Sequence, residues 1–92
     1  MNLERYDARL RLLPCVVCVL LGEPPRPCAE LHHVGDPLTE RNEHGKVPLC
    51  NEHHQGPEGI HGLHRRGFVK ASKISDVMML STTVRLFVGD LP

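Results

Sequence analysis

Large aromatic side chains are scarce in this chain. Its 92 residues contain no tryptophan, one tyrosine and two phenylalanines. A domain this small buries little apolar surface, so a core without large side chains needs a disulfide or a metal as additional support. Four cysteines and seven histidines supply the groups for either solution.

A net charge of either sign is also lacking. Eleven lysines and arginines balance eleven aspartates and glutamates. This balance excludes a strongly basic protein that coats nucleic acid through bulk charge alone. Eight glycines and eight prolines exclude a long helical bundle or a coiled coil, and 92 residues allow one domain.

No apolar run is long enough to cross a membrane. The longest run, LLPCVVCVLLG at residues 12–22, falls short of the roughly 20 residues that a spanning helix needs. Glu4, Asp7 and a proline inside the run argue against a secretory signal peptide, as does the lack of an A-x-A-like exit. We therefore expect no membrane association.

Short elements separated by turn residues predict a small α+β domain over residues 1–92. Apolar spacing and caps indicate helices and strands, with polar or glycine-rich segments between them. The expected helices cover 3–13, 50–55 and 76–88, the expected strands 28–34 and 46–49, a tight turn 15–18, and loops 35–45 and 56–64. Ser75 caps the last helix, and the residues expected on its core-facing stripe are Val77, Leu80, Val84 and Phe87.

Two pairs of residues have the spacing of a structural zinc site. Cys15 and Cys18 form C-x2-C, which lets one turn direct two sulfurs at the same ion, and Cys50 and His53 repeat that spacing. An alternative set replaces His53 with Cys28. Free core cysteines and two disulfides in a secreted protein are the competing interpretations. The paired spacings favour metal, and with it a reducing compartment.

The remaining histidines suggest a second metal site. His32 and His33 are neighbours on an expected strand, so their side chains point to opposite faces. His54 follows His53 in the expected helix, and His61 lies in the glycine-rich segment beyond it. Three protein ligands with an open position are typical of a catalytic site, for which we expect His32, His54 and His61. Glu58 is an alternative to His61.

This order of residues resembles the HNH, or ββα-metal, nucleases. The resemblance implies that His32 and His54 bind a catalytic metal and that His33 is the general base. It also implies that a residue before the second strand orients that base, for which His44 is the first choice and Asn42 the rival. The zinc clamp of many HNH proteins corresponds here to Cys15, Cys18, Cys50 and His53.

A narrower resemblance covers roughly residues 4–87. The strings AELHHV, PLCNEHHQG, GIHGL and RRGF, in this order after C-x-x-C, are similar to the phage Ref family of RecA-dependent nucleases. The resemblance implies cleavage of DNA to a 5′-phosphate and a 3′-hydroxyl, assisted by a recombinase filament, in the cytoplasm of a bacterium or its phage-infected host. Only 14 residues precede Cys15, where the family has a basic extension, and the stretch VKASKISDVMML matches loosely. We therefore expect weak DNA binding by the chain alone.

The expected cofactors are one structural zinc and one catalytic divalent ion. Imidazole ligands suit zinc and other transition ions, whereas magnesium prefers oxygen, so zinc and magnesium both stay open for the second ion. The expected DNA contacts come from a stretch without acidic residues and are Arg65, Arg66, Lys70 and Lys73. Arg41 and Lys46 are further candidates beside the strands. The alternative function is a zinc-stabilised nucleic-acid-binding module without catalysis.

Overall fold

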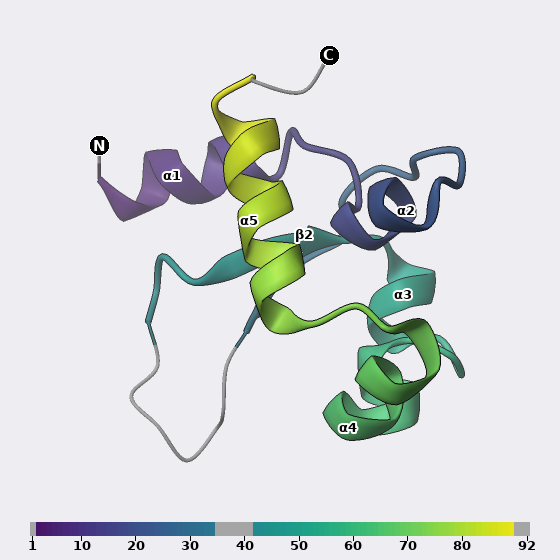
Figure 1. Cartoon of the computed structure of the whole chain (residues 1–92). Helices are drawn as coiled ribbons and strands as arrows, with labels where there is room; N and C mark the ends of the chain where they lie inside the picture. The colour runs from purple at the N-terminus through teal and green to yellow at the C-terminus, as the bar shows by residue number, and fades with distance from the viewer. Residues whose placement is uncertain (1, 35–41, 90–92) are drawn as a thin grey trace.

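The fold is known from a computed structural model, which describes residues 2–34 and 42–89. The elements follow in the order α1 (Leu3–Leu10), α2 (Val16–Leu21), β1 (Glu30–His33), β2 (Lys46–Leu49), α3 (Asn51–Gln55), α4 (Ile60–Ser72) and α5 (Asp76–Phe87) (Figure 1). The molecule is a small α+β structure with a two-stranded sheet, which confirms the coarse prediction.

An antiparallel hairpin and the short helix after it form the middle of the molecule. β1 pairs with β2, so that His32 lies opposite Val47 and Leu31 opposite Pro48. A two-stranded sheet has only edge strands, which is why Pro48 is accepted there. Cys50 then caps α3, its sulfur accepting from the N–H of His53 at 3.5 Å. The second strand and α3 lie where the sequence predicts them.

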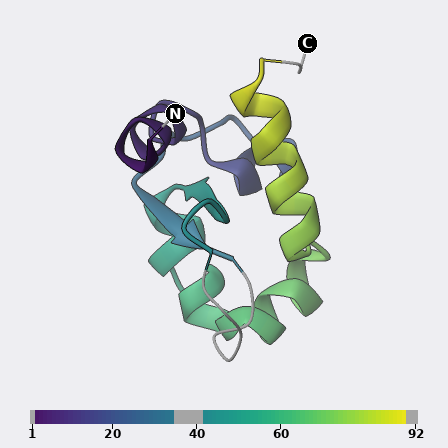
Figure 2. The same cartoon turned by 90° about the vertical axis from the view of Figure 1, so that its left-hand side faces the viewer.

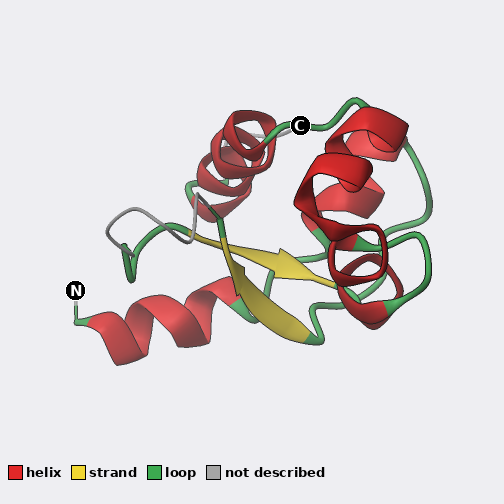
Figure 3. Cartoon of the chain, turned by 90° about the horizontal axis from the view of Figure 1, so that it is seen from below, coloured by secondary structure: helices red, strands yellow, loops and turns green. Residues whose placement is uncertain are grey.

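The remaining helices surround the hairpin. α5 packs on β2 and on α2, while α3 contacts both β1 and α4 (Figures 1 and 2). Seen from below, α1 runs along the hairpin on the side away from α4 (Figure 3). One hydrophobic cluster joins α2, β2, α4 and α5, and its members are Cys15, Val16, Val17, Cys18, Val47, Leu49, Cys50, Ile60, Phe68, Ile74 and Met79.

Residues 15–18 form the start of a helix, where the sequence pattern predicts a tight turn. α2 extends from Val16 to Leu21, with Cys15 as its N-cap and Gly22 as its C-cap at φ 72°. Glycine ends the helix there because a positive φ carries no Cβ penalty for it. The two cysteines of C-x2-C can still face one ion, because residues three positions apart lie on the same face of a helix.

The expected loop over 56–64 is wrong in its second half, where α4 begins at Ile60. The glycines that suggested a loop serve close packing instead. A Cβ on Gly62 would lie 2.2 Å from the carbonyl oxygen of Gly56, so only glycine lets the start of α4 approach the end of α3. The helix is interrupted at His64, whose φ of 61° and ψ of 163° are not helical.

The helix over 76–88 is confirmed as α5. Its expected buried stripe is confirmed in part, because Leu80 packs against the hydrophobic cluster and Phe87 is half-buried, but it is wrong at the other two positions. Val77 is 73% exposed and Val84 58% exposed. The buried residues are Met79, Thr82 and Thr83. Threonine is compatible with this position because the hydroxyl of Thr83 donates to the carbonyl of Met79 at 2.7 Å, which leaves its methyl group for the core.

Lys46 is unavailable for the phosphate contact expected of it. It is 5% exposed, and its Nζ donates to Oδ2 of Asp7 in α1 at 2.8 Å. The other candidate there, Arg41, lies outside the described residues. Among residues 2–34 and 42–89, no helix is both long and apolar enough to cross a bilayer.

Candidate metal centres

The first centre gathers three cysteines and one histidine from two distant parts of the chain. Cys15 and Cys18 come from the start of α2, and Cys50 and His53 from the start of α3. The ligand atoms of all four lie within 4.8 Å of one another. The three cysteines are buried, and the side chain of His53 is 12% exposed.

The distances in this Cys3His cluster match a tetrahedral ion. Nδ1 of His53 lies 3.6, 3.5 and 3.3 Å from the sulfurs of Cys15, Cys18 and Cys50. The sulfurs of Cys18 and Cys50 are 4.0 Å apart. Ordinary zinc bond lengths give about 3.6 Å between nitrogen and sulfur and about 3.8 Å between two sulfurs. The cluster could therefore hold a metal ion such as zinc.

Charges around the cluster favour thiolate at one of its cysteines. Burial raises the pKa of Cys15 to about 12. Burial also acts to raise the pKa of Cys50, but hydrogen bonds from the His53 N–H and from Cys15, Arg26 and Cys18 outweigh it and lower that pKa. Arg26 places Nη1 3.5 Å from the Cys18 sulfur and 4.0 Å from the Cys50 sulfur, so it offsets negative charge on the ligands.

Cys28 takes no part in this cluster, so the alternative ligand set is not formed. Its sulfur donates to the carbonyl of Glu30 at 3.4 Å. The four cysteines are free thiols, with no disulfide between them.

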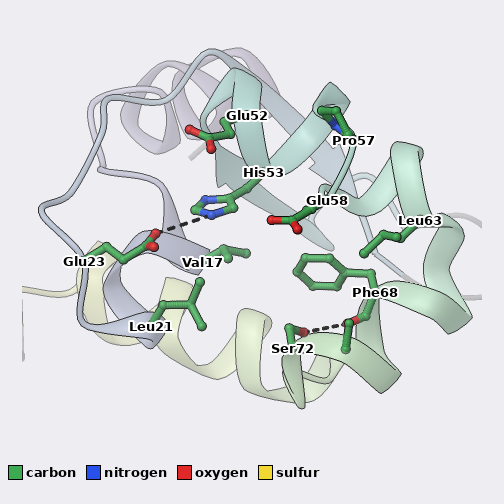
Figure 4. A pocket seen from close by; sticks show the side chains of 11 residues that line it. Val17, Leu21, Glu23, Glu52, His53, Pro57, Glu58, Leu63, Phe68 and Ser72 are labelled. Carbon is green, nitrogen blue, oxygen red and sulfur yellow. Dashed lines mark hydrogen bonds and ion pairs between the residues drawn. The ribbon is translucent and has the colours of Figure 1, made fainter.

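His53 is contacted at both ring nitrogens. Its Nδ1 faces the three sulfurs, and its Nε2 lies 3.4 Å from Oε1 of Glu23 (Figure 4). A carboxylate at the second nitrogen of a ligand histidine fixes the ring for metal binding.

The second group of ligands consists of His32, His54 and His61. A strand, a helix and the first turn of another helix each supply one ring, and the three ligand nitrogens lie within 4.8 Å of one another. Nε2 of His54 is 3.0 Å from Nε2 of His61. The three ring centroids are 4.5–5.3 Å apart. We call this group the histidine triad. Glu58, the alternative to His61, is not part of the triad and lies between His53 and Phe68 (Figure 4).

Two histidines of the triad favour the neutral form. Burial, together with the neighbouring rings of His54 and His61, lowers the pKa of His32 to about 4. Burial and His61 also lower the pKa of His54. Neutral imidazole is the form that binds metal, so these lowered pKa values favour metal binding by His32 and His54.

Glu30 supports the triad and was not singled out from the sequence. Its Oε2 lies 3.4 Å from Nδ1 of His54, so the Nε2 of that ring is left for a ligand. This is the carboxylate–histidine arrangement found around protein-bound metals. A signal was available, since Glu30 is two residues before His32 and therefore on the same face of β1.

His33 and His44 lie outside the triad. The Nε2 of His33 is 3.3 Å from Oε2 of Glu43, and its side chain is 25% exposed. The ring of His44 packs against Tyr6, with centroids 5.1 Å apart, and the hydroxyl of Tyr6 donates to its carbonyl. Asn42, the rival to His44, accepts from the backbone N–H of His44 at 2.8 Å. Glu43, which no sequence motif singles out, is the carboxylate beside His33.

Of the basic residues expected to contact DNA, Arg65 lies beside the triad. Its Nη2 and Nε donate to Oδ2 of Asp76 at 2.7 and 3.0 Å. Arg65, Asp76 and His32 line one small cavity. Arg66 and Lys70 are exposed on α4, and Lys73 caps that helix at φ 65°.

Comparison with known protein families, characterised proteins and solved structures finds no significant match to this chain. A function for this protein is therefore argued from the chemistry of its two candidate metal centres.

Proposed function

We propose that this protein is a metal-dependent DNA endonuclease of the HNH type. The observation that carries the proposal is the meeting of His32, His54 and His61 beside a separate Cys3His cluster. Two antiparallel strands followed at once by a helix supply two of the three rings, in the order that the ββα-metal resemblance implies. The cluster would be the structural zinc site, and the triad the catalytic site.

The triad favours catalysis because it leaves coordination positions open. A structural ion is normally enclosed by four protein ligands, as the Cys3His cluster provides. The triad offers three, and His61 is exposed, so solvent and substrate reach it. A divalent ion held there would act as a Lewis acid on a phosphodiester oxygen.

The proposed general base is His33. Its contact with the Glu43 carboxylate would orient the ring, as a carboxylate does for a catalytic histidine. Glu43 would then have the orienting role first considered for His44. In this mechanism His33 takes a proton from the attacking water.

Arg65 is proposed to bind the substrate phosphate. Asp76 holds its Nε and Nη2, which leaves Nη1 to donate to a ligand, and the Arg65 side chain is 51% exposed beside His32. A guanidinium suits phosphate because it offers several donors in a fixed plane. By family resemblance the protein acts with a RecA-type filament on DNA, in the cytoplasm of a bacterium.

Counting metal ions separates this proposal from a non-catalytic zinc module. Cobalt titration followed by visible absorption, with elemental analysis, gives the number of ions per chain. We expect two ions in the wild type, one in His54→Ala and two in His64→Ala, a matched histidine outside both centres. Only the variant with one ion should lose DNA cleavage. A single ion in the wild type would favour the module and contradict the nuclease.

A further inference from the structure

A groove of about 730 Å³ opens beside the Cys3His cluster and is not used by the proposed catalytic site. It is surrounded by α2, by α3 and the short segment that follows it, and by α4 (Figure 4). Its lining residues are Val17, Leu21, Glu23, Glu52, His53, Pro57, Glu58, Leu63, Phe68, Ala71 and Ser72. None of the three triad histidines is among them. The groove is therefore a second concave surface with its own chemistry.

The groove combines an apolar floor with acidic side chains. Leu21 and Leu63 line it from opposite sides, and the buried side chains of Val17 and Phe68 lie beneath them (Figure 4). Leu21 is 45% exposed, so part of this apolar surface is open to water. An apolar concave surface of this size is suited to binding apolar side chains of a ligand.

The charge of the groove is negative. Glu23 and Glu52 share one cation, Arg26, at 3.8 and 3.0 Å. Glu58 extends into the space between His53 and Phe68 (Figure 4), and no cation among the described residues pairs with it. Three carboxylates and one guanidinium leave a net negative potential, which repels the phosphates of nucleic acid and attracts lysine and arginine.

We propose that this groove binds a segment of a partner protein in which leucine-like side chains are flanked by lysine or arginine. The apolar residues would enter between α2 and α4, and the basic residues would pair with Glu58 and the two glutamates at the rim.

The groove and the triad are accessible at the same time. His53 lines the groove, whereas His54 belongs to the triad, and consecutive helix residues point about 100° apart. A partner in the groove therefore leaves the triad open to DNA. This inference goes beyond the proposed nuclease function and does not depend on it.

The probe is a capped octapeptide, Ac-GKALLKKG-NH2, titrated into the zinc-loaded, isotope-labelled chain and followed by NMR. Two matched peptides serve as controls, Ac-GEALLEEG-NH2 with reversed charge and Ac-GKASSKKG-NH2 without leucine. We expect the first peptide to bind at least fivefold more tightly than either control. The signals that shift should belong to Val17, Leu21 and Leu63.

Two variants of the protein locate the binding site. Glu58→Gln should weaken the first peptide by about two- to fivefold, as expected for an exposed ion pair. Glu4→Gln removes an exposed carboxylate from α1, outside the groove, and should leave binding unchanged. Equal affinity for the three peptides, shifts outside the groove, or no effect of Glu58→Gln would overturn the proposal. So would a DNA oligonucleotide that shifts the same groove signals.

Discussion

At the scale of single residues, the sequence predicted which candidate ligands gather in each group, but not the carboxylates that contact their histidines. Cys15 and Cys18, like Cys50 and His53, are three positions apart, and this local spacing is sufficient to bring each pair to one ion. Glu30 and Glu43 reach their histidines through tertiary structure. The position of Glu30 two residues before His32 is the one local signal for these carboxylates, and Glu43 has none.

The first prediction concerns the Cys3His cluster. Cys18→Ser should abolish binding of the structural zinc and unfold the domain, because such an ion contributes about 10–16 kcal/mol, comparable to the whole stability of a small domain. Circular dichroism and elemental analysis measure both effects. Cys28→Ser is the control and should keep the fold and the zinc. A folded Cys18→Ser chain without zinc would contradict the assignment.

The second prediction concerns Arg65 and its holder Asp76. Arg65→Ala should lower kcat/KM for DNA cleavage by about 10- to 100-fold, the loss expected for one charged hydrogen bond to phosphate. Asp76→Asn should act mainly by raising KM, since the guanidinium is still present but less firmly placed. Steady-state kinetics separate kcat from KM. Arg85→Ala removes an exposed cation of α5 outside the small cavity that Arg65 shares with His32, and it should change kcat/KM less than twofold. Equal effects of all three variants would refute the role of Arg65.

At the scale of elements, the sequence predicted the helices and strands that local signals mark. The cap at Ser75 and the strand 46–49 are confirmed, because a cap and a short apolar run with turn residues beside it are local features. α4 was missed because its glycines reflect close contact with α3, which only the fold reveals. The prediction for the buried face of α5 is wrong at Val77 and Val84, because Thr82 and Thr83 pack there as small apolar groups.

The third prediction concerns the interruption of α4. His64 adopts φ 61° and ψ 163°, a region that is open almost only to glycine. His64→Gly should therefore stabilise the domain by about 1 kcal/mol, which raises Tm by about 4–8 °C. His64→Ala removes the imidazole but keeps the Cβ, so it should show no such gain. Thermal unfolding of both variants makes the comparison, and a Gly variant less stable than the Ala variant would show that no strain is stored there.

At the scale of the whole molecule, the sequence predicted the α+β class and a Cys3His cluster that could hold a metal ion. One small α+β structure joins its elements around a hydrophobic cluster that contains three of the four cysteines. The net charge of zero has a consequence for function, because phosphate neutralisation supplies most nonspecific affinity for DNA. The chain has few cations to release counterions, and Lys46 is buried against Asp7.

The fourth prediction rests on this weak attraction. Cleavage of naked DNA should be slow and should fall further as salt rises, whereas a RecA filament on the DNA should raise it by increasing the effective concentration of the enzyme. An assay at moderate salt, on duplex and single-stranded DNA with and without the filament, checks this. Vigorous cleavage that RecA does not change would show that the dependence implied by the family resemblance is absent here.

The central claim is that the histidine triad and His33 form a nuclease site, and nicking of a supercoiled plasmid tests it most directly. The zinc-loaded wild type and His33→Ala are compared at equal metal content, with zinc or magnesium added. We predict that the wild type converts the plasmid to nicked and linear forms with 5′-phosphate ends. His33→Ala should retain both ions and the fold but lose at least 100-fold in rate, the contribution expected of a general base. Equal rates for the two proteins, or no nicking by a wild type that holds both ions, would contradict the claim.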